Sequence, residues 1–361
     1  QRPVRISYFI SPHGFGHAAR AAAVMEALHG LDSRIEFEVF TTVPRWFFED
    51  SLSGEFLYHP FLTDIGFVQK TPFKSDIPET LRRLDDFYPP DPEKVESLAS
   101  LLKSGKSKLV VCDIAPLGII VAKKAGIPCL LVENFTWDWI YEDQEDENGA
   151  FSKHVHYLKE LLSAVDYRIQ TEPVCRPCAA DLTAAPVSRK PRVSGLQVRK
   201  ELGVGEKANI VMVAAGGVPW NFSFLDRISK YSEVFFLIPG IGEEQQAKGN
   251  LVFLPHRSGF YHPDLLNASD AVVGKAGYST VAEVYRAGAP FAYAGRRDFR
   301  ESSVLASFIE QNMNGMEISE EELQEGLWVS KLPELLSMER RRCDGPNGAD
   351  EIAEFVHEMI L

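Results

Sequence analysis

The sequence is short of cysteine, of basic residues and of long apolar runs, and each shortage excludes a class of protein. Only five of its 361 residues are cysteine, and no secretory signal pattern opens the chain, so we expect no disulfide framework. No apolar run reaches the roughly 18 residues that a membrane-spanning helix needs. The 51 acidic residues outnumber the 38 basic ones, and the net charge of −13 disfavours binding to nucleic acid or to an anionic membrane. We therefore expect a cytoplasmic protein with no transmembrane segment and no nucleic-acid partner.

Metal-binding patterns are also scarce. C-R-P-C, with Cys175 and Cys178, has the spacing of a redox or zinc motif, but no second pair of ligands accompanies it. The acidic run 142–149 lacks the glycine and glutamate placement of a calcium loop. The sequence therefore predicts no metal site.

Short apolar runs alternate with helical segments along most of the chain. Runs this short and this rich in Val, Ile and Phe are typical of parallel strands that helices cover on both faces. The strand candidates are 4–10, 35–42, 108–114, 128–134, 167–171, 209–217, 234–240, 251–255, 271–277 and 290–295.

This alternation breaks once, at 185–203, where Pro, Lys, Arg and Gly collect without apolar periodicity, as in a linker. The chain length also favours two domains. We predict an α/β fold of two Rossmann-like, doubly wound domains whose parallel sheets face each other across a cleft. Residues 1–190 form the N-terminal domain and 191–345 the C-terminal domain. The helix within 346–361 packs on a domain surface, with a return to the N-terminal domain as one possible route.

The loop S-P-H-G-F-G-H joins the first predicted strand to an alanine-rich helix. Gly14 and Gly16 let a ligand approach the backbone, and the helix end favours anions. Ala19 replaces the third glycine of G-x-G-x-x-G, so a dinucleotide site is only weakly indicated. A neutral histidine at the first helical turn suits a general base, which makes His17 the catalytic candidate. For His17 a capping role, and for His13 a loop role, are equally compatible with the sequence.

A second glycine-bearing junction, 269–298, is the more specific of the two. A strand leads into a helix whose first turn carries hydroxyls, a combination that suits a diphosphate. Glu283 lies one turn beyond Ser279 and is placed to accept ribose hydroxyls. The donor-site candidates at this junction are Gly274, Lys275, Gly277, Tyr278, Ser279, Thr280 and Glu283.

Two further segments follow strand ends. Gly216 and Gly217 end the strand candidate 209–217 and place flexible backbone at the ligand edge of the second sheet. The aromatic stretch 132–141 carries Asn134 and Asp138, which with His13 are our candidates for the acceptor side. A domain-packing cluster is the alternative interpretation of these aromatic residues.

Several motifs together resemble those of GT-B glycosyltransferases, especially the lipid II N-acetylglucosaminyltransferase-like group. The closest resemblance is to the N-terminal glycosyltransferase-like region of plant L-arabinokinases, and it extends over essentially the whole chain. The motifs that carry it are GFGHAAR, NFTWDWIY, GKAGYSTVAE, RRDFRE and GPNGADEIAEFV.

The resemblance implies a nucleotide sugar bound mainly by the C-terminal domain, no metal and no cofactor. His17 then matches the catalytic base, Gly16 the donor-facing turn, and Glu283 the ribose-binding carboxylate. Residues Gly277, Ser279 and Thr280 match the diphosphate-binding helix start, and Arg297, Asp298 and Glu301 fall where the family contacts the donor sugar. The expected reaction is inverting transfer of a sugar, from UDP by family resemblance, to an unknown hydroxyl acceptor.

Three alternatives stay open at this point. The same fold can epimerise or hydrolyse a nucleotide sugar, and Asp113 and Asp138 are the carboxylates available for that chemistry. The chain can also be a non-catalytic module that binds a nucleotide sugar. A dinucleotide oxidoreductase is the third possibility, with Glu36 or Glu38 near the distance expected of a ribose-binding acid. Nothing in the sequence indicates the acceptor or the oligomeric state.

Overall fold

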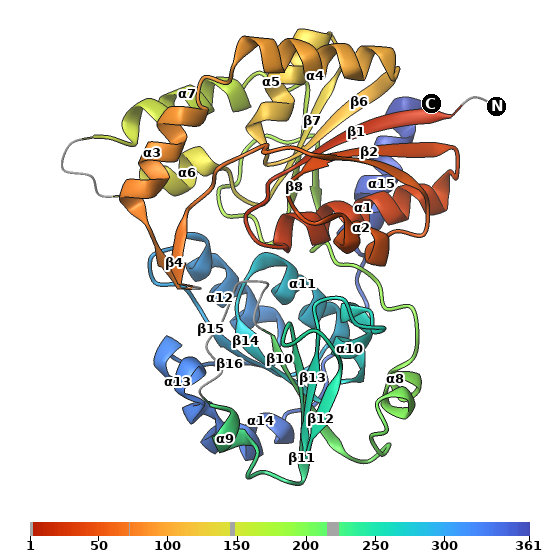
Figure 1. Cartoon of the computed structure of the whole chain (residues 1–361), viewed down its shortest axis with the longest axis vertical. Helices are drawn as coiled ribbons and strands as arrows, with labels where there is room; N and C mark the ends of the chain where they lie inside the picture. Colours follow the sequence, from red (N-terminus) through yellow and green to blue (C-terminus); the bar gives the residue numbers. More distant parts are fainter. Residues whose placement is uncertain (1–2, 72, 145–148, 215–223) are drawn as a thin grey trace. The chain divides into compact units, whose positions relative to one another are not determined.

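The computed structural model describes residues 3–71, 73–144, 149–214 and 224–361. The chain forms two compact units, shown in Figure 1. The first contains Gln1–Lys70, Ser75–Ser188 and Pro346–Leu361, and the second contains Thr71–Lys74 and Arg189–Gly345. Each unit holds a seven-stranded sheet, so the predicted α/β class with two parallel-sheet domains is confirmed.

The sheet of the first unit is parallel throughout and has the strand order β3-β2-β1-β6-β7-β8-β9. β1 lies in the middle of the sheet. The chain continues from β1 through β2 to the edge strand β3, and then crosses back to β6, from which β7, β8 and β9 follow toward the other edge. The order therefore reverses between β1 and β6, and this is where doubly wound sheets bind ligands. The strands are β1 (Val4–Ile10), β2 (Ile35–Thr41), β3 (Phe56–Pro60), β6 (Ser107–Asp113), β7 (Cys129–Glu133), β8 (Tyr167–Thr171) and β9 (Leu182–Ala184). A separate pair consists of β4 (Gln69–Thr71) and β5 (Lys74–Ser75).

Helices cover both faces of this sheet. Figure 1 shows α4 and α5 on one face and α1 with α15 on the other. The alanines of α1, from Ala18 to Ala23, are buried, and their small side chains allow close packing of the helix. The helices of this unit are α1 (Gly16–Leu31), α2 (Arg45–Ser51), α3 (Ile77–Phe87), α4 (Pro92–Ser104), α5 (Pro116–Ala125), α6 (Trp137–Glu142), α7 (Ser152–Leu162) and α15 (Gly348–Ile360).

The C-terminal helix α15 belongs to the first unit. Asn347 caps it by accepting from the Ala349 N–H at 3.0 Å and also donates to the Ser188 carbonyl at 2.9 Å. A side chain on Gly348 would place its Cβ 1.9 Å from the Ala185 carbonyl oxygen. Only glycine therefore fits where the chain enters this helix.

The sheet of the second unit has the order β12-β13-β11-β10-β14-β15-β16 and is parallel except for the edge pair β12–β13. Ile210 and Met212 point into one core and Val211 and Val213 into the other, so β10 is buried on both faces. The strands are β10 (Asn209–Ala214), β11 (Val234–Pro239), β12 (Gln246–Lys248), β13 (Leu251–Leu254), β14 (Ala271–Lys275), β15 (Phe291–Ala294) and β16 (Gly315–Glu317).

The helices of the second unit pack on both faces of its sheet and complete the hydrophobic core on each face. Those on one face are α8 (Gly195–Glu201), α10 (His262–Ala268), α11 (Tyr278–Ala287) and α12 (Glu301–Asn312). Those on the other are α9 (Leu225–Ile228), α13 (Glu320–Glu325), the 3₁₀ helix η1 (Leu327–Lys331) and α14 (Leu332–Ser337). None of the helices that the structure describes is long and apolar enough to cross a membrane.

Candidate functional site

A histidine–aspartate pair lies where the strand order of the first unit reverses. His17 stands in the first turn of α1, directly after β1, and Asp113 ends the neighbouring strand β6. The two strands pair in register at Ile10 and Asp113, so both side chains emerge at the carboxyl edge of the sheet. His17 Nδ1 lies 2.9 Å from Asp113 Oδ1. This spacing and location are those of a base with an orienting carboxylate.

Arg20, one turn further along α1, fixes the carboxylate from the other side. Its Nε and Nη2 donate to the two oxygens of Asp113 at 2.8 and 2.6 Å. Burial alone would raise the pKa of Asp113, but the charge and hydrogen bonds of Arg20 outweigh it and lower the pKa. Asp113 is therefore an ionised carboxylate that only accepts. His17 must donate from Nδ1, which leaves Nε2 as the basic nitrogen.

The N-terminus of α1 adds backbone donors to the same edge. No side chain caps this helix at Phe15, so the amides of Gly16, His17 and Ala18 keep their capacity to bind an anion. Gly14 has a φ of 69° and turns the loop there.

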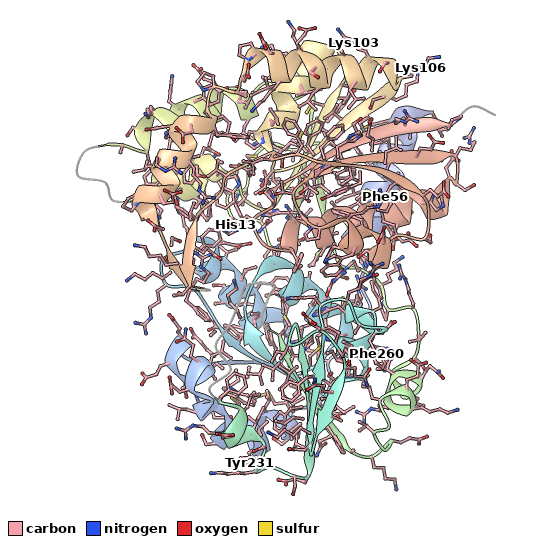
Figure 2. All side chains as sticks on the ribbon, viewed as in Figure 1. His13, Phe56, Lys103, Lys106, Tyr231 and Phe260 are labelled. Carbon is pink, nitrogen blue, oxygen red and sulfur yellow. The ribbon has the colours of Figure 1, made fainter. Side chains whose placement is uncertain are left out.

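His13, predicted on the acceptor side, packs against an aromatic cluster (Figure 2 labels it). Its ring centroid lies 5.1 Å from that of Trp137 in an edge-to-face contact. The indole of Trp137 donates to Asp64, a fully buried carboxyl that also accepts from the Ile65 N–H at 2.8 Å. Burial raises the pKa of Asp64 to about 7. Sequence analysis missed Asp64, because one acid in a loop carries no pattern.

The other two acceptor-side candidates face different partners. Asn134 Oδ1 accepts from Arg20 Nη1 at 2.8 Å and so belongs to the His17 network. Asp138, on α6, pairs with Arg176 at 2.8 Å. The acceptor-side role of His13, Asn134 and Asp138 stays a prediction.

In the second unit, the half-buried Lys275 ends β14 just before α11, whose start has no side-chain cap. Burial, followed by the charge of Arg296, lowers the pKa of Lys275 to about 8, although Glu301 and Asp298 oppose the shift. Arg296 is buried and lies 3.6 Å from Asp298. These four residues form the charged cluster of the second unit.

The remaining donor candidates surround this cluster. Tyr278 and Thr280 are buried and Ser279 is half-buried in the first turn of α11. The N-cap residue of this helix is Gly277, so no side chain caps it. Gly274 has a packing role, because a Cβ there would lie 2.3 Å from the Ala214 carbonyl oxygen of β10. Gly216 and Gly217 lie outside the described residues.

For the donor sugar, sequence analysis selected Arg297, Asp298 and Glu301. Arg297 and Asp298 are exposed, whereas Glu301 is buried at the start of α12. The buried member of the arginine pair is Arg296, which sequence analysis did not select. Because the two arginines are adjacent, the sequence does not indicate which of their side chains is buried.

Glu283, predicted to bind ribose, is already paired. Its Oε1 accepts from Arg189 Nε at 2.8 Å, and its Oε2 lies 3.2 Å from His262 Nδ1. Burial would raise the pKa of Glu283, but Arg189 and His262 lower it to about 2. Arg189 and Glu283 are 8% and 3% exposed at their side chains. Both carboxylate oxygens of Glu283 are therefore already paired, Oε1 with Arg189 and Oε2 with His262.

Neither unit offers a metal centre among the residues described: no group of three His, Cys, Asp or Glu side chains lies close enough to hold an ion.

The doubly wound sheets and the polar groups at their carboxyl edges define a GT-B type glycosyltransferase architecture. Among solved structures, a UDP-glucosyltransferase from Polygonum tinctorium has 15% identity and a TM-score of 0.62, covering 99% of this chain and 98% of its own. MurG from Acinetobacter baumannii has 17% identity and a TM-score of 0.55, covering 99% of this chain and all of its own. These similarities show the fold.

The sequence model of glycosyl transferase family 1 matches residues 4–333, and the chain belongs to this family. The L-arabinokinase of Arabidopsis thaliana is 30% identical over 362 residues, which cover 98% of this chain and 34% of that protein. The chain thus spans about one third of the length of this curated relative. The resemblance inferred from the motifs is confirmed.

Proposed function

We propose that the protein transfers a sugar from a UDP-sugar to a hydroxyl acceptor, with inversion at the anomeric carbon and without a metal ion. The observation that carries the proposal is the hydrogen bond from His17 Nδ1 to Asp113 at 2.9 Å. It orients the imidazole and leaves Nε2 free to accept a proton at the carboxyl edge of the first unit. We propose UDP as the nucleotide because the structurally similar Polygonum enzyme is a UDP-glucosyltransferase.

In this mechanism, His17 Nε2 takes the acceptor's hydroxyl proton while the oxygen attacks the anomeric carbon. The bond from that carbon to the diphosphate oxygen breaks, and UDP leaves with the electron pair. Asp113 stabilises the imidazolium that forms, and Arg20 keeps Asp113 ionised.

The second unit supplies the charge that the leaving diphosphate needs. Lys275 and the amides at the start of α11 would stabilise it, with Arg296 beside them. Fixed cations and helix amides are the groups that perform this role where no metal does. The proposal assigns the ribose hydroxyls to Glu283, which must then exchange Arg189 or His262 for the nucleotide.

The test is UDP release from UDP-glucose and related UDP-sugars in the presence of a library of hydroxyl acceptors, with product detection by mass spectrometry. We expect acceptor-dependent release that falls on the order of 10³-fold in His17→Ala. Binding of UDP should be unchanged in that variant. A suitable control is His156→Ala, which removes an exposed histidine of α7.

Three results would contradict the proposal. Release of free sugar at the same rate with and without acceptors would favour hydrolysis, and a changed configuration at a sugar carbon other than the anomeric one would favour epimerisation. Absence of UDP binding would remove the donor site altogether.

A further inference from the structure

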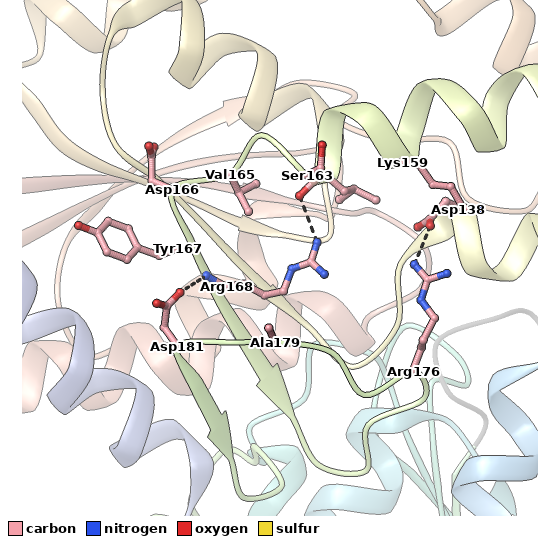
Figure 3. A pocket seen from close by; sticks show the side chains of 11 residues that line it. Asp138, Lys159, Ser163, Val165, Asp166, Tyr167, Arg168, Arg176, Ala179 and Asp181 are labelled. Atoms are coloured by element: carbon pink, nitrogen blue, oxygen red, sulfur yellow. Dashed lines mark hydrogen bonds and ion pairs between the residues drawn. The ribbon is translucent and has the colours of Figure 1, made fainter.

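A pocket on the first unit, separate from the His17 network, has the character of a ligand site. It has a volume of about 430 Å³, within the range of small-molecule sites. Its walls come from the end of α7, from β8 and from the loop 172–181 that carries the C-R-P-C motif (Figure 3). Three cations line it, Lys159, Arg168 and Arg176, together with three acids, Asp138, Asp166 and Asp181. Lys159 and Arg176 also pair with Glu142.

Arg168 is the cation of this pocket that forms no direct ion pair with a described carboxylate, although its charge acts on the buried Glu133. Its guanidinium donates to Cys178 Sγ at 3.1 Å and to the Leu162 carbonyl at 3.1 Å. Its own backbone N–H, not its side chain, donates to Asp181. Within the described part of the chain, no carboxylate pairs with this half-buried guanidinium. Such a charge is costly to remove from water until an anion joins it.

At the other side of the pocket, Arg176 and Asp138 form an ion pair that uses only one of the two carboxylate oxygens of Asp138. Arg176 bonds Asp138 Oδ2 at 2.8 Å. Oδ1 of Asp138 is buried and accepts no hydrogen bond from any described residue. The Asp138 side chain is 1% exposed and that of Arg176 is 42% exposed, so Arg176 can turn while Asp138 cannot. An anion that draws Arg176 toward Arg168 would free Oδ2 of Asp138, the oxygen that Arg176 bonds, for a hydroxyl donor.

We propose that this pocket binds a small, hydroxylated anion: a sugar that bears a phosphate or a carboxylate. Arg168 and Arg176 hold the anionic group, which two guanidinium forks suit better than one ammonium does. Asp138 accepts from a hydroxyl group of the same molecule. The site does not depend on the proposed transfer reaction.

The experiment is isothermal titration of the whole chain with four probes. Glucose 6-phosphate and glucuronate show whether the pocket prefers a phosphate or a carboxylate as the anionic group on the sugar. Glucose tests the hydroxyl groups alone, and inorganic phosphate tests the anion alone. We expect one or both anionic sugars to bind at least tenfold more tightly than glucose or phosphate.

Two variants assign the binding to this pocket. Arg168→Met should weaken the anionic sugar about tenfold or more, as expected for loss of a charge-assisted bond. Asp138→Asn should reduce the preference for the sugar over inorganic phosphate. The matched control is Arg82→Met, because Arg82 is an exposed arginine of α3 paired with Glu79 and Asp86. Thermal melting checks that each variant is folded.

The proposal is overturned if no probe binds with a Kd below about 1 mM, which corresponds to about 4 kcal/mol. It is also overturned if the folded Arg168→Met variant binds as the wild type does. Equal affinity for phosphate and for the anionic sugars would show an anion contact without a sugar site.

Discussion

Lys275 gives the donor-site proposal a pH dependence that an ordinary lysine would not produce. Its side chain is protonated below about pH 8 and neutral above, because burial and Arg296 lower its pKa. Asp298 and Glu301 are the acidic groups that oppose the shift. The diphosphate of UDP carries its full charge from pH 7 upward, because its last proton leaves near pH 6. Raising the pH from 7 to 9 therefore changes Lys275 and leaves the ligand unchanged.

The size of the effect follows from the pKa of about 8. At pH 7 about nine tenths of the free protein carries the ammonium, and at pH 9 about one tenth does. If UDP binds the charged form, its affinity falls about tenfold over these two pH units, or about 1.4 kcal/mol. A lysine with an ordinary pKa near 10.4 would lose less than about a tenth of its charge.

Isothermal titration with UDP at pH 7, 8 and 9 measures this slope. Buffers of different ionisation enthalpy also report the proton taken up on binding at pH 9. Lys275→Met should bind more weakly at pH 7 and show no slope. Lys230→Met, which changes an exposed lysine of the same unit, should behave like the wild type. A flat wild-type profile, or an equal slope in Lys275→Met, would refute the assignment of Lys275 to the diphosphate.

Three further predictions concern buried charges. Asp113→Asn should lower kcat on the order of 10³-fold by releasing His17, with UDP binding unchanged; a loss below about tenfold would contradict the orienting role. Arg189→Met should lower the free energy of unfolding of the second unit by about 3–5 kcal/mol in a urea titration, because Glu283 keeps only His262. Arg189→Met combined with Glu283→Gln should recover most of that loss, and no recovery would contradict the ion-pair account. Asp64 has a folded-state pKa of about 7, above its ordinary 3.8, so the stability that it contributes is full below pH 4 and is lost as the pH rises through 7. Asp64→Asn should therefore gain about 2–3 kcal/mol relative to the wild type between pH 5 and pH 8, and a constant difference would show that Asp64 does not titrate there.

The sequence predicts the buried strands well because they are apolar on both faces. Each strand candidate, such as 4–10 and 167–171, overlaps a strand of the structure. The missed strands β3 and β9 end the first sheet, and β12 and β16 end the second. An edge strand has one neighbour and is partly exposed, so it carries neither a continuous apolar run nor a strict alternation. β12 shows this plainly, since Gln246, Ala247 and Lys248 are all exposed.

The glycine–histidine and glycine–hydroxyl junctions could be found from the sequence, because loop chemistry and helix starts are local patterns. The sequence names Asp113 as an available carboxylate, but it does not show which residue pairs with His17 or with Glu283. Asp113 lies 96 residues from His17, and Arg189 lies 94 residues from Glu283. Which residue becomes the partner depends on which strand or linker the fold places beside His17 or Glu283. A single acid or base has no periodicity or spacing in the sequence that would reveal this. The sequence shows the Glu283 carboxylate, but only the fold shows that Arg189 and His262 already pair with it. If a donor ribose binds Glu283 as proposed, its hydroxyls must replace one of these two partners, and this requirement ties donor affinity to the mobility of that partner.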